Sequence, residues 1–149
     1  MVLERIQDSK GVKRNMGSVI YIAGPIGNHH TVGPKEMYAN VRRAEDIMFH
    51  LMKKGWSAIC PHLSYHCWIN WPEDMPWDNW MRQDFDFVRK SDALFYMTPE
   101  LYGPSKGAKL EFDLATKLGM PVYTNLIDVP EIIHEKSATA LYEDIINAP

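Results

Sequence analysis

Short apolar runs alternate with amphipathic helical patterns from residue 18 onward, and this alternation constrains the fold more than any other feature. Strand-like runs cover residues 19–23, 56–60, 93–97 and 121–127, and helical periodicity covers residues 37–51, 77–90, 105–118 and 137–147. Gly55 and Gly119 follow two of the helical patterns, where glycine commonly ends a helix. Strands that alternate with helices predict a parallel sheet with right-handed crossovers and helices on both faces.

The length of 149 residues suits one domain with one continuous core. We therefore predict a single-domain α/β sandwich of the Rossmann-like or flavodoxin-like type over residues 18–149. Helices flank its parallel sheet. The sheet has four strands, one for each apolar run, or five if a further strand is present. Residues 1–17 are polar and basic, and we expect them to form a flexible arm.

Charge and composition argue against several classes of partner. The net charge of −3 removes the electrostatic basis for binding a nucleic-acid polymer, which depends on clustered Lys and Arg. No apolar run approaches the length of about 20 residues that spans a membrane. The amino-terminal segment has no apolar stretch of signal-peptide length and the two cysteines make no disulfide framework, so we expect a cytoplasmic protein.

Three loops follow strands, at residues 24–33, 61–76 and 98–105, and ligands of parallel sheets bind at such loops. The last loop leads into a helix whose N-terminus attracts anions. The Ser105 hydroxyl either caps this helix or binds a phosphate, and composition alone favours capping. Gly107 allows a close backbone approach, but the Gly-Lys-Ser/Thr signature of a P-loop is absent.

Two carboxylates are candidates for catalysis. Glu111 lies six residues after Ser105, where helical side chains lean back toward the N-terminus and the ligand, although spacing alone still favours a solvent-exposed Glu. Asp84 lies on another helix and competes with its neighbour Asp86. Cleavage of a glycosidic bond needs one carboxylate at the anomeric carbon and one acid for the departing group. Asp92 is interpreted as structural, bonding backbone groups where a strand begins.

Four residues within one short segment raise the question of a metal site: Cys60, His62, His66 and Cys67. Adjacent His66 and Cys67 point apart in regular backbone, and neither a Cys-x-x-Cys nor a His-Glu-x-x-His pattern is present. We therefore expect no metal and no other cofactor, and we interpret His62 as a residue that lines the substrate site.

Tryptophans cluster in and after the second loop, at Trp68, Trp71, Trp77 and Trp80. Their rings can stack on a base or a sugar, and Trp80 is the one we assign to substrate binding. An ordered lid or a contact between subunits explains the cluster equally well.

Four motifs between residue 18 and about residue 125 carry a family resemblance: Tyr21-Ile-Ala-Gly24-Pro, Asp84, Ser91-Asp92-Ala-Leu and Ser105-Lys-Gly107-Ala-Lys-Leu-Glu111. Their order and spacing resemble the nucleoside 2-deoxyribosyltransferase superfamily. That superfamily includes the transferases, the 2′-deoxynucleoside 5′-monophosphate N-glycosidases and small relatives common in phages and bacteria. The chain looks most similar to the small relatives.

The resemblance implies a retaining mechanism in which Glu111 attacks the anomeric carbon of deoxyribose and forms a covalent glycosyl intermediate. It also implies that Asp84 handles the base and that the phenol of Tyr21 holds or tunes the nucleophile. Gly24 corresponds to the loop glycine where the backbone meets the substrate. The neighbouring Pro25 and Ile26 join it in the expected substrate-binding set.

The resemblance leaves the 5′ substituent open. Ser105 sits where the monophosphate glycosidases have a phosphate-binding serine and the transferases have an acidic residue, which favours a nucleotide. Those glycosidases follow the first-strand glycine with Ser-Ile-Arg, whereas this chain has Pro25-Ile26-Gly27. Phosphate recognition would then depend on Ser105, the helix N-terminus, and Lys106 or a histidine of the pair at positions 29 and 30.

We therefore expect cleavage of the N-glycosidic bond of a 2′-deoxynucleotide or 2′-deoxynucleoside, with water favoured over a second base as acceptor. One alternative is a non-catalytic nucleotide-binding sensor or adaptor of the same fold, and another is a phage factor that modifies bases or sequesters nucleotides. The resemblance also implies a homo-oligomer. Asn125 or the segment around Tyr142 would then be offered to a neighbouring subunit's site.

Overall fold

The main sheet of the protein has four parallel strands and confirms the predicted α/β class. The computed structural model describes residues 5–7, 13–15, 18–27, 32–70 and 73–149. Along the chain the strands are β3 (Val19–Ala23), β4 (Ser57–Ile59), β5 (Ala93–Tyr96) and β6 (Val122–Tyr123). They lie side by side in the order β4-β3-β5-β6.

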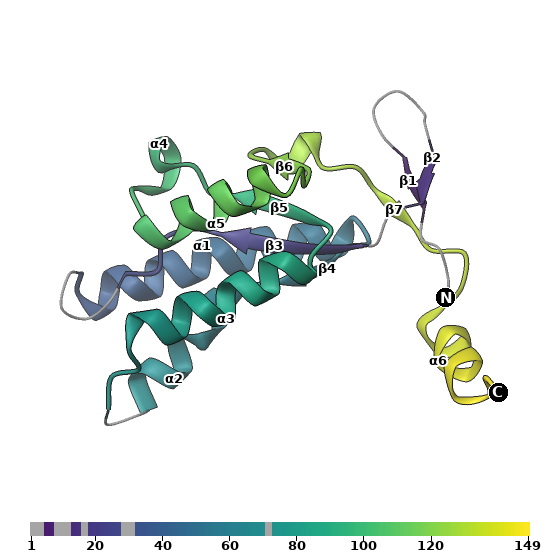
Figure 1. Cartoon of the computed structure of the whole chain (residues 1–149), viewed down its shortest axis with the longest axis horizontal. Coiled ribbons are helices and arrows are strands. Elements are labelled where there is room, and N and C mark those ends of the chain that lie inside the picture. Colours follow the sequence, from purple (N-terminus) through teal and green to yellow (C-terminus); the bar gives the residue numbers. More distant parts are fainter. Residues whose placement is uncertain (1–4, 8–12, 16–17, 28–31, 71–72) are drawn as a thin grey trace.

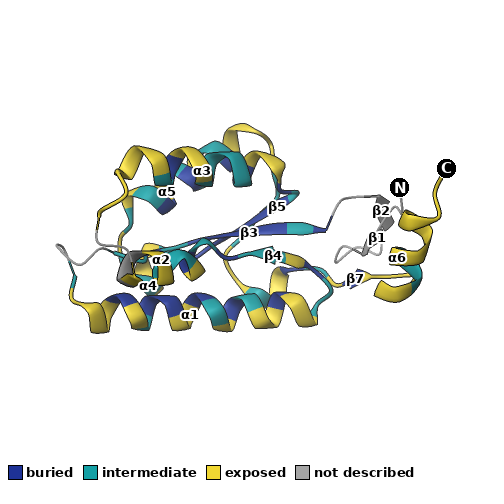
Figure 2. Ribbon diagram, turned by 90° about the horizontal axis from the view of Figure 1, so that it is seen from below, coloured by how far each residue is buried: buried dark blue, intermediate teal, exposed yellow. Residues whose placement is uncertain are grey.

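Helices cover both faces of this sheet, because alternate side chains of each apolar strand point to opposite sides. Figure 2 shows α1 (Pro34–Lys53) on one face, and α3 (Trp77–Lys90) and α5 (Lys106–Lys117) on the other. Ile20 and Ile22 of β3 pack in one core cluster with residues of α1. Tyr21 and Ala23 pack in a second cluster with residues of α3 and α5.

The strand order changes direction at β3, which pairs with β4 on one side and with β5 on the other. Loops that leave the two strands at such a switch point diverge and open a crevice. Gly24 begins the loop after β3, and a Cβ atom there would lie 2.3 Å from the Sδ of Met97. Only glycine therefore lets the backbone pass this close to the end of β5.

Several connections are more ordered than the sequence indicates. The predicted loop at residues 61–76 contains a 3-10 turn, η1 (Pro61–Ser64), and a short helix, α2 (Tyr65–Asn70), and the predicted loop at 98–105 contains α4 (Pro99–Tyr102). The predicted strand at 121–127 is wrong in length: β6 ends at Tyr123, and the 3-10 turn η2 (Leu126–Asp128) follows. The last predicted helix is present as α6 (Ala138–Ile146).

A second, small sheet was not predicted. Within the arm at residues 1–17 that we expected to be flexible, β1 (Arg5–Gln7) and β2 (Lys13–Asn15) form antiparallel strands, and β1 also pairs with β7 (Ile132–Ile133). This sheet and α6 lie beyond one end of the main sheet (Figure 1). Among the described residues, no helix is long and apolar enough to cross a membrane.

Candidate active site

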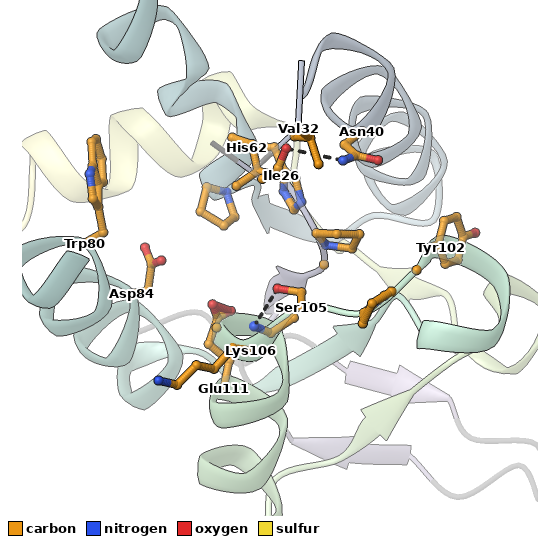
Figure 3. A pocket seen from close by; sticks show the side chains of 18 of the residues that line it. Ile26, Val32, Asn40, His62, Trp80, Asp84, Tyr102, Ser105, Lys106 and Glu111 are labelled. Atoms are coloured by element: carbon orange, nitrogen blue, oxygen red, sulfur yellow. Dashed lines mark hydrogen bonds between the residues drawn. The ribbon is translucent and has the colours of Figure 1, made fainter. Parts of the chain in front are cut away.

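A cavity of about 540 Å³ lies where β3, β4 and β5 end, within the size range of small-molecule sites. Figure 3 shows its lining. The lining comes from the loop after β3, the start of α1, the turn η1, the helix α3, and the segment that leads into α5. Nine of the ten predicted site residues line it: Gly24, Pro25, Ile26, His62, Trp80, Asp84, Ser105, Gly107 and Glu111. The tenth, Tyr21, is fully buried in β3.

Glu111 is buried in the wall of the cavity, with 5% of its surface exposed. The solvent-exposed position that spacing alone favoured is therefore wrong. Its Oε2 has no hydrogen-bond partner among the described residues. Burial, and then the charge of Asp84, raise the pKa of Glu111 well above its usual value. The fold thus holds a carboxyl group where its ionised form is costly, which is typical of functional sites.

Asp84 is the carboxyl of α3 that faces the cavity, whereas its neighbour Asp86 pairs with Arg89 on the exposed side. Burial raises the pKa of Asp84 to about 6. Figure 3 shows Asp84 and Glu111 reaching into the same space from separate helices. The arrangement gives the cavity two carboxyl groups whose ionisation is coupled.

The phenol of Tyr21 interacts with the carboxyl groups of both Glu111 and Asp84. Its hydroxyl makes no hydrogen bond of normal geometry within the described part of the chain, yet it is close enough to lower the pKa of both Glu111 and Asp84. Burial and the two carboxyls raise the pKa of the phenol well above its usual value. Tyr21 therefore stays protonated and can donate to either carboxylate.

Ser105 caps α5, as the sequence favoured, because its Oγ accepts a hydrogen bond of 3.1 Å from the backbone N–H of Ala108. The hydroxyl hydrogen remains available for another acceptor in the cavity. Lys106 lies at the rim with its Nζ 4.9 Å from the ring centre of Trp77. The N-terminal end of α5 therefore gathers a hydroxyl, an ammonium group and the positive end of the helix dipole.

Two of the four clustered tryptophans, Trp77 and Trp80, line the cavity. Trp71 lies outside the described residues, as do the histidines at positions 29 and 30, and nothing is described for the side chain of Trp68. The predicted stacking role thus has two residues in a suitable place.

The residues considered for a metal do not converge. Within the described ranges no three His, Cys, Asp or Glu side chains are gathered to hold an ion. Cys67 is exposed, and the Sγ of buried Cys60 lies 3.8 Å from the Nδ1 of His62. Burial lowers the pKa of His62 to about 4, against the nearby backbone of Gly24 and Pro25, which raises it. His62 is therefore a neutral ring in the cavity wall.

Sequence reasoning missed the wall that α1 contributes, where Glu36 and Asn40 line the cavity. Asn40 is 5% exposed and donates through Nδ2 to the carbonyl oxygen of Ile26 at 3.2 Å. A signal for it was present, because Asn40 lies three residues after Met37 and four before Ala44 on the apolar stripe of the helix. A polar residue on a buried stripe needs a partner.

Other predicted residues lie away from the cavity. The backbone N–H of Val19 donates to the Oδ2 of Asp92 at 2.9 Å, which confirms the structural role of this carboxylate at a strand end. The Oδ1 of Asn125 accepts from the backbone N–H of Ile127 at 3.0 Å, and Tyr142 is exposed on α6. Neither of these last two lines the cavity of its own chain.

The family model described as "Domain of unknown function (DUF4406)" matches residues 18–124, well over half of the chain. The protein belongs to the DUF4406 family. The DUF4406 match runs from the strand that carries Tyr21 to the end of β6, so it includes every element that lines the cavity. No curated protein and no solved structure matches the chain.

Proposed function

We propose that this DUF4406 protein cleaves the N-glycosidic bond of a 2′-deoxynucleotide or 2′-deoxynucleoside, with Glu111 as the nucleophile. The observation that carries the proposal is the pair of carboxyl groups, Glu111 and Asp84, that face one cavity and both interact with the phenol of Tyr21. The relation of the DUF4406 family to nucleoside 2-deoxyribosyltransferase-like proteins supports it.

The chemistry has two steps. In the first, the carboxylate of Glu111 attacks C1′ of the sugar, the bond from C1′ to the base nitrogen breaks, and its electron pair leaves with the base. Asp84 gives its proton to that base. In the second, water attacks C1′, its proton passes to Asp84, and the ester bond to Glu111 breaks. The free sugar and the starting enzyme result.

The first step needs Glu111 ionised and Asp84 protonated, so one proton must be placed correctly between them. In the free protein, deep burial favours the proton on Glu111. The positive charge that develops at C1′ favours the carboxylate beside it and moves the proton toward Asp84. Tyr21 interacts with both groups, so it provides a path: it accepts a proton from one carboxyl as it donates its own to the other.

The N-terminal end of α5 favours a substrate with a 5′-phosphate. Ser105 offers its hydroxyl hydrogen there, and Lys106 offers an ammonium group at the rim. Glu36 also lines the cavity and opposes an added negative charge. The balance between these groups is why both nucleotides and nucleosides belong in the test.

Release of free base is the deciding measurement. The protein is incubated with each of the four common 2′-deoxynucleosides and their 5′-monophosphates, and the products are separated by chromatography. We expect free base from at least one compound, and a second base added to the reaction identifies transfer if it is incorporated. Tight binding without release by the wild-type protein would favour the non-catalytic sensor or adaptor instead.

A further inference from the structure

The loop at residues 24–27 forms one wall of the cavity, and after β3 it continues in neither a helix nor a strand. Gly24 is packed against Met97. Gly27 has a φ of 80°, a backbone conformation that residues other than glycine rarely adopt. Between them Ile26 lines the cavity. The position of Ile26 therefore depends on what holds its backbone.

Asn40 holds it. The Nδ2 of Asn40 donates to the carbonyl oxygen of Ile26, and its Oδ1 accepts from the Nη2 of Arg43 one helical turn further on. A guanidinium group only donates, so Arg43 must face the oxygen of the amide, which leaves the nitrogen for Ile26. Arg43 thereby sets which way the amide points.

We propose that Asn40 is a positioning residue, oriented by Arg43, that holds the loop at 24–27 in the place where Ile26 contacts the substrate. The expected effect on catalysis rests on the proposed function. Glu111, Asp84 and Tyr21 come from α5, α3 and β3, and none of them lies on α1. Loosening the loop therefore weakens substrate binding and leaves the bond-breaking groups in place. His62 adds support from η1, since its ring lies near the backbone of Gly24 and Pro25.

Three variants separate this role from a general effect on α1. Asn40→Asp keeps the size of the side chain and its contact with Arg43, but it places an oxygen opposite the carbonyl of Ile26. Arg43→Met removes the exposed group that orients the amide. Arg42→Met is the matched control, because the neighbouring Arg42 is also exposed and pairs with Glu45 at 2.8 Å across the same spacing.

We expect Asn40→Asp to raise KM for the best substrate of the wild-type protein about five- to tenfold, the effect of one hydrogen bond, with kcat unchanged. Arg43→Met follows with a smaller rise, and Arg42→Met behaves as wild type. Amide hydrogen exchange in the peptide that covers residues 24–27 should quicken in the first two variants and not in the control. Melting temperatures show whether α1 is intact in each variant.

The exchange experiment needs no substrate, so it decides the positioning role even if the protein releases no base. Unchanged exchange at 24–27 in Asn40→Asp and Arg43→Met would overturn the proposal. So would an equal rise of KM in all three variants, or a fall of kcat without a rise of KM. If exchange quickens as expected but no compound is cleaved, the proposed function fails and the positioning role stands.

Discussion

At the scale of single residues, the cavity holds ionisable carboxyl groups at buried positions, where their charged forms are costly. Glu111 is nearly inaccessible to water and lies close enough to Asp84 for each ionised group to oppose the other. The family motif was sufficient to name both carboxyls and Tyr21, but helical spacing left Glu111 on the surface. Its burial depends on how α5 packs against α3, which no local pattern contains.

Replacing Glu111 by Gln should abolish catalysis without harming the fold. We expect base release to fall about a thousandfold or more, because the amide cannot attack C1′. Stability at pH 8 should rise, because Glu111 is ionised in the unfolded chain at this pH and its raised pKa in the fold costs free energy that Gln does not. Chromatography and thermal unfolding measure the two effects. Asp113→Asn, two residues further along α5 on its exposed side, is the control, and wild-type turnover in Glu111→Gln would disprove the nucleophile.

Asp84 should make the protein less stable as the pH rises. Its pKa is about 6 in the folded protein and 3.8 as an ordinary Asp, so the folded state holds the proton more tightly. That contribution is fully present below about pH 4 and is lost as the pH rises through about 6. We expect the free energy of unfolding, from urea titrations, to decrease over this window and to decrease less in Asp84→Asn. An equal slope in both proteins would contradict the shift.

At the scale of elements, long periodic segments were predictable and short ones were not. The helices α1, α3, α5 and α6 follow apolar spacing over several turns, and all four were expected. The helices α2 and α4 are only six and four residues long, too short for such spacing to be recognised. The strands β1 and β2 have three residues each, too few for an apolar alternation to be recognised, and β1 also pairs with distant β7, a contact that no local pattern predicts.

Ser105 and Ser137 allow the capping role to be separated from a substrate role. Each serine caps its helix through a 3.1 Å bond from a backbone N–H three residues on, so Ser105→Ala and Ser137→Ala should each lose about 1 kcal/mol of helix stability or less. Only Ser105→Ala should raise KM, and more for a 5′-monophosphate than for its nucleoside. Steady-state kinetics on the matched pair of substrates measures this. An equal rise of KM for both substrates would argue against a contact between Ser105 and the phosphate.

At the scale of the whole molecule, α6 is a helix that its own chain leaves largely uncovered. It has no buried residue, and Tyr142, Ile145 and Ile146 expose more than half of their surfaces. It also lies outside the region that the family model matches. An apolar helix with so little cover on its own chain suits a contact with another copy.

We expect the protein to form a dimer or larger assembly through α6. Light scattering coupled to size exclusion should give a mass above one chain for the wild type, and Ile145→Glu should shift it toward a monomer because a charge would be buried at the contact. Ile127→Glu is the matched control, since Ile127 is exposed on η2 away from α6. A monomeric wild-type protein would contradict the expected oligomer. An unchanged mass for Ile145→Glu would show that α6 does not form the contact.

The helices on the two faces of the main sheet contribute different residues to the cavity. Tyr21 packs with residues of α3 and α5, and Asp84 and Glu111 lie on those helices, whereas Asn40 and His62 line the cavity from α1 and η1. On the proposed function, the reacting groups therefore come from one side of the sheet, and the residues that position the loop at 24–27 come from the other. We expect substitutions on the α1 side to alter substrate binding without displacing the reacting groups proposed on the other side.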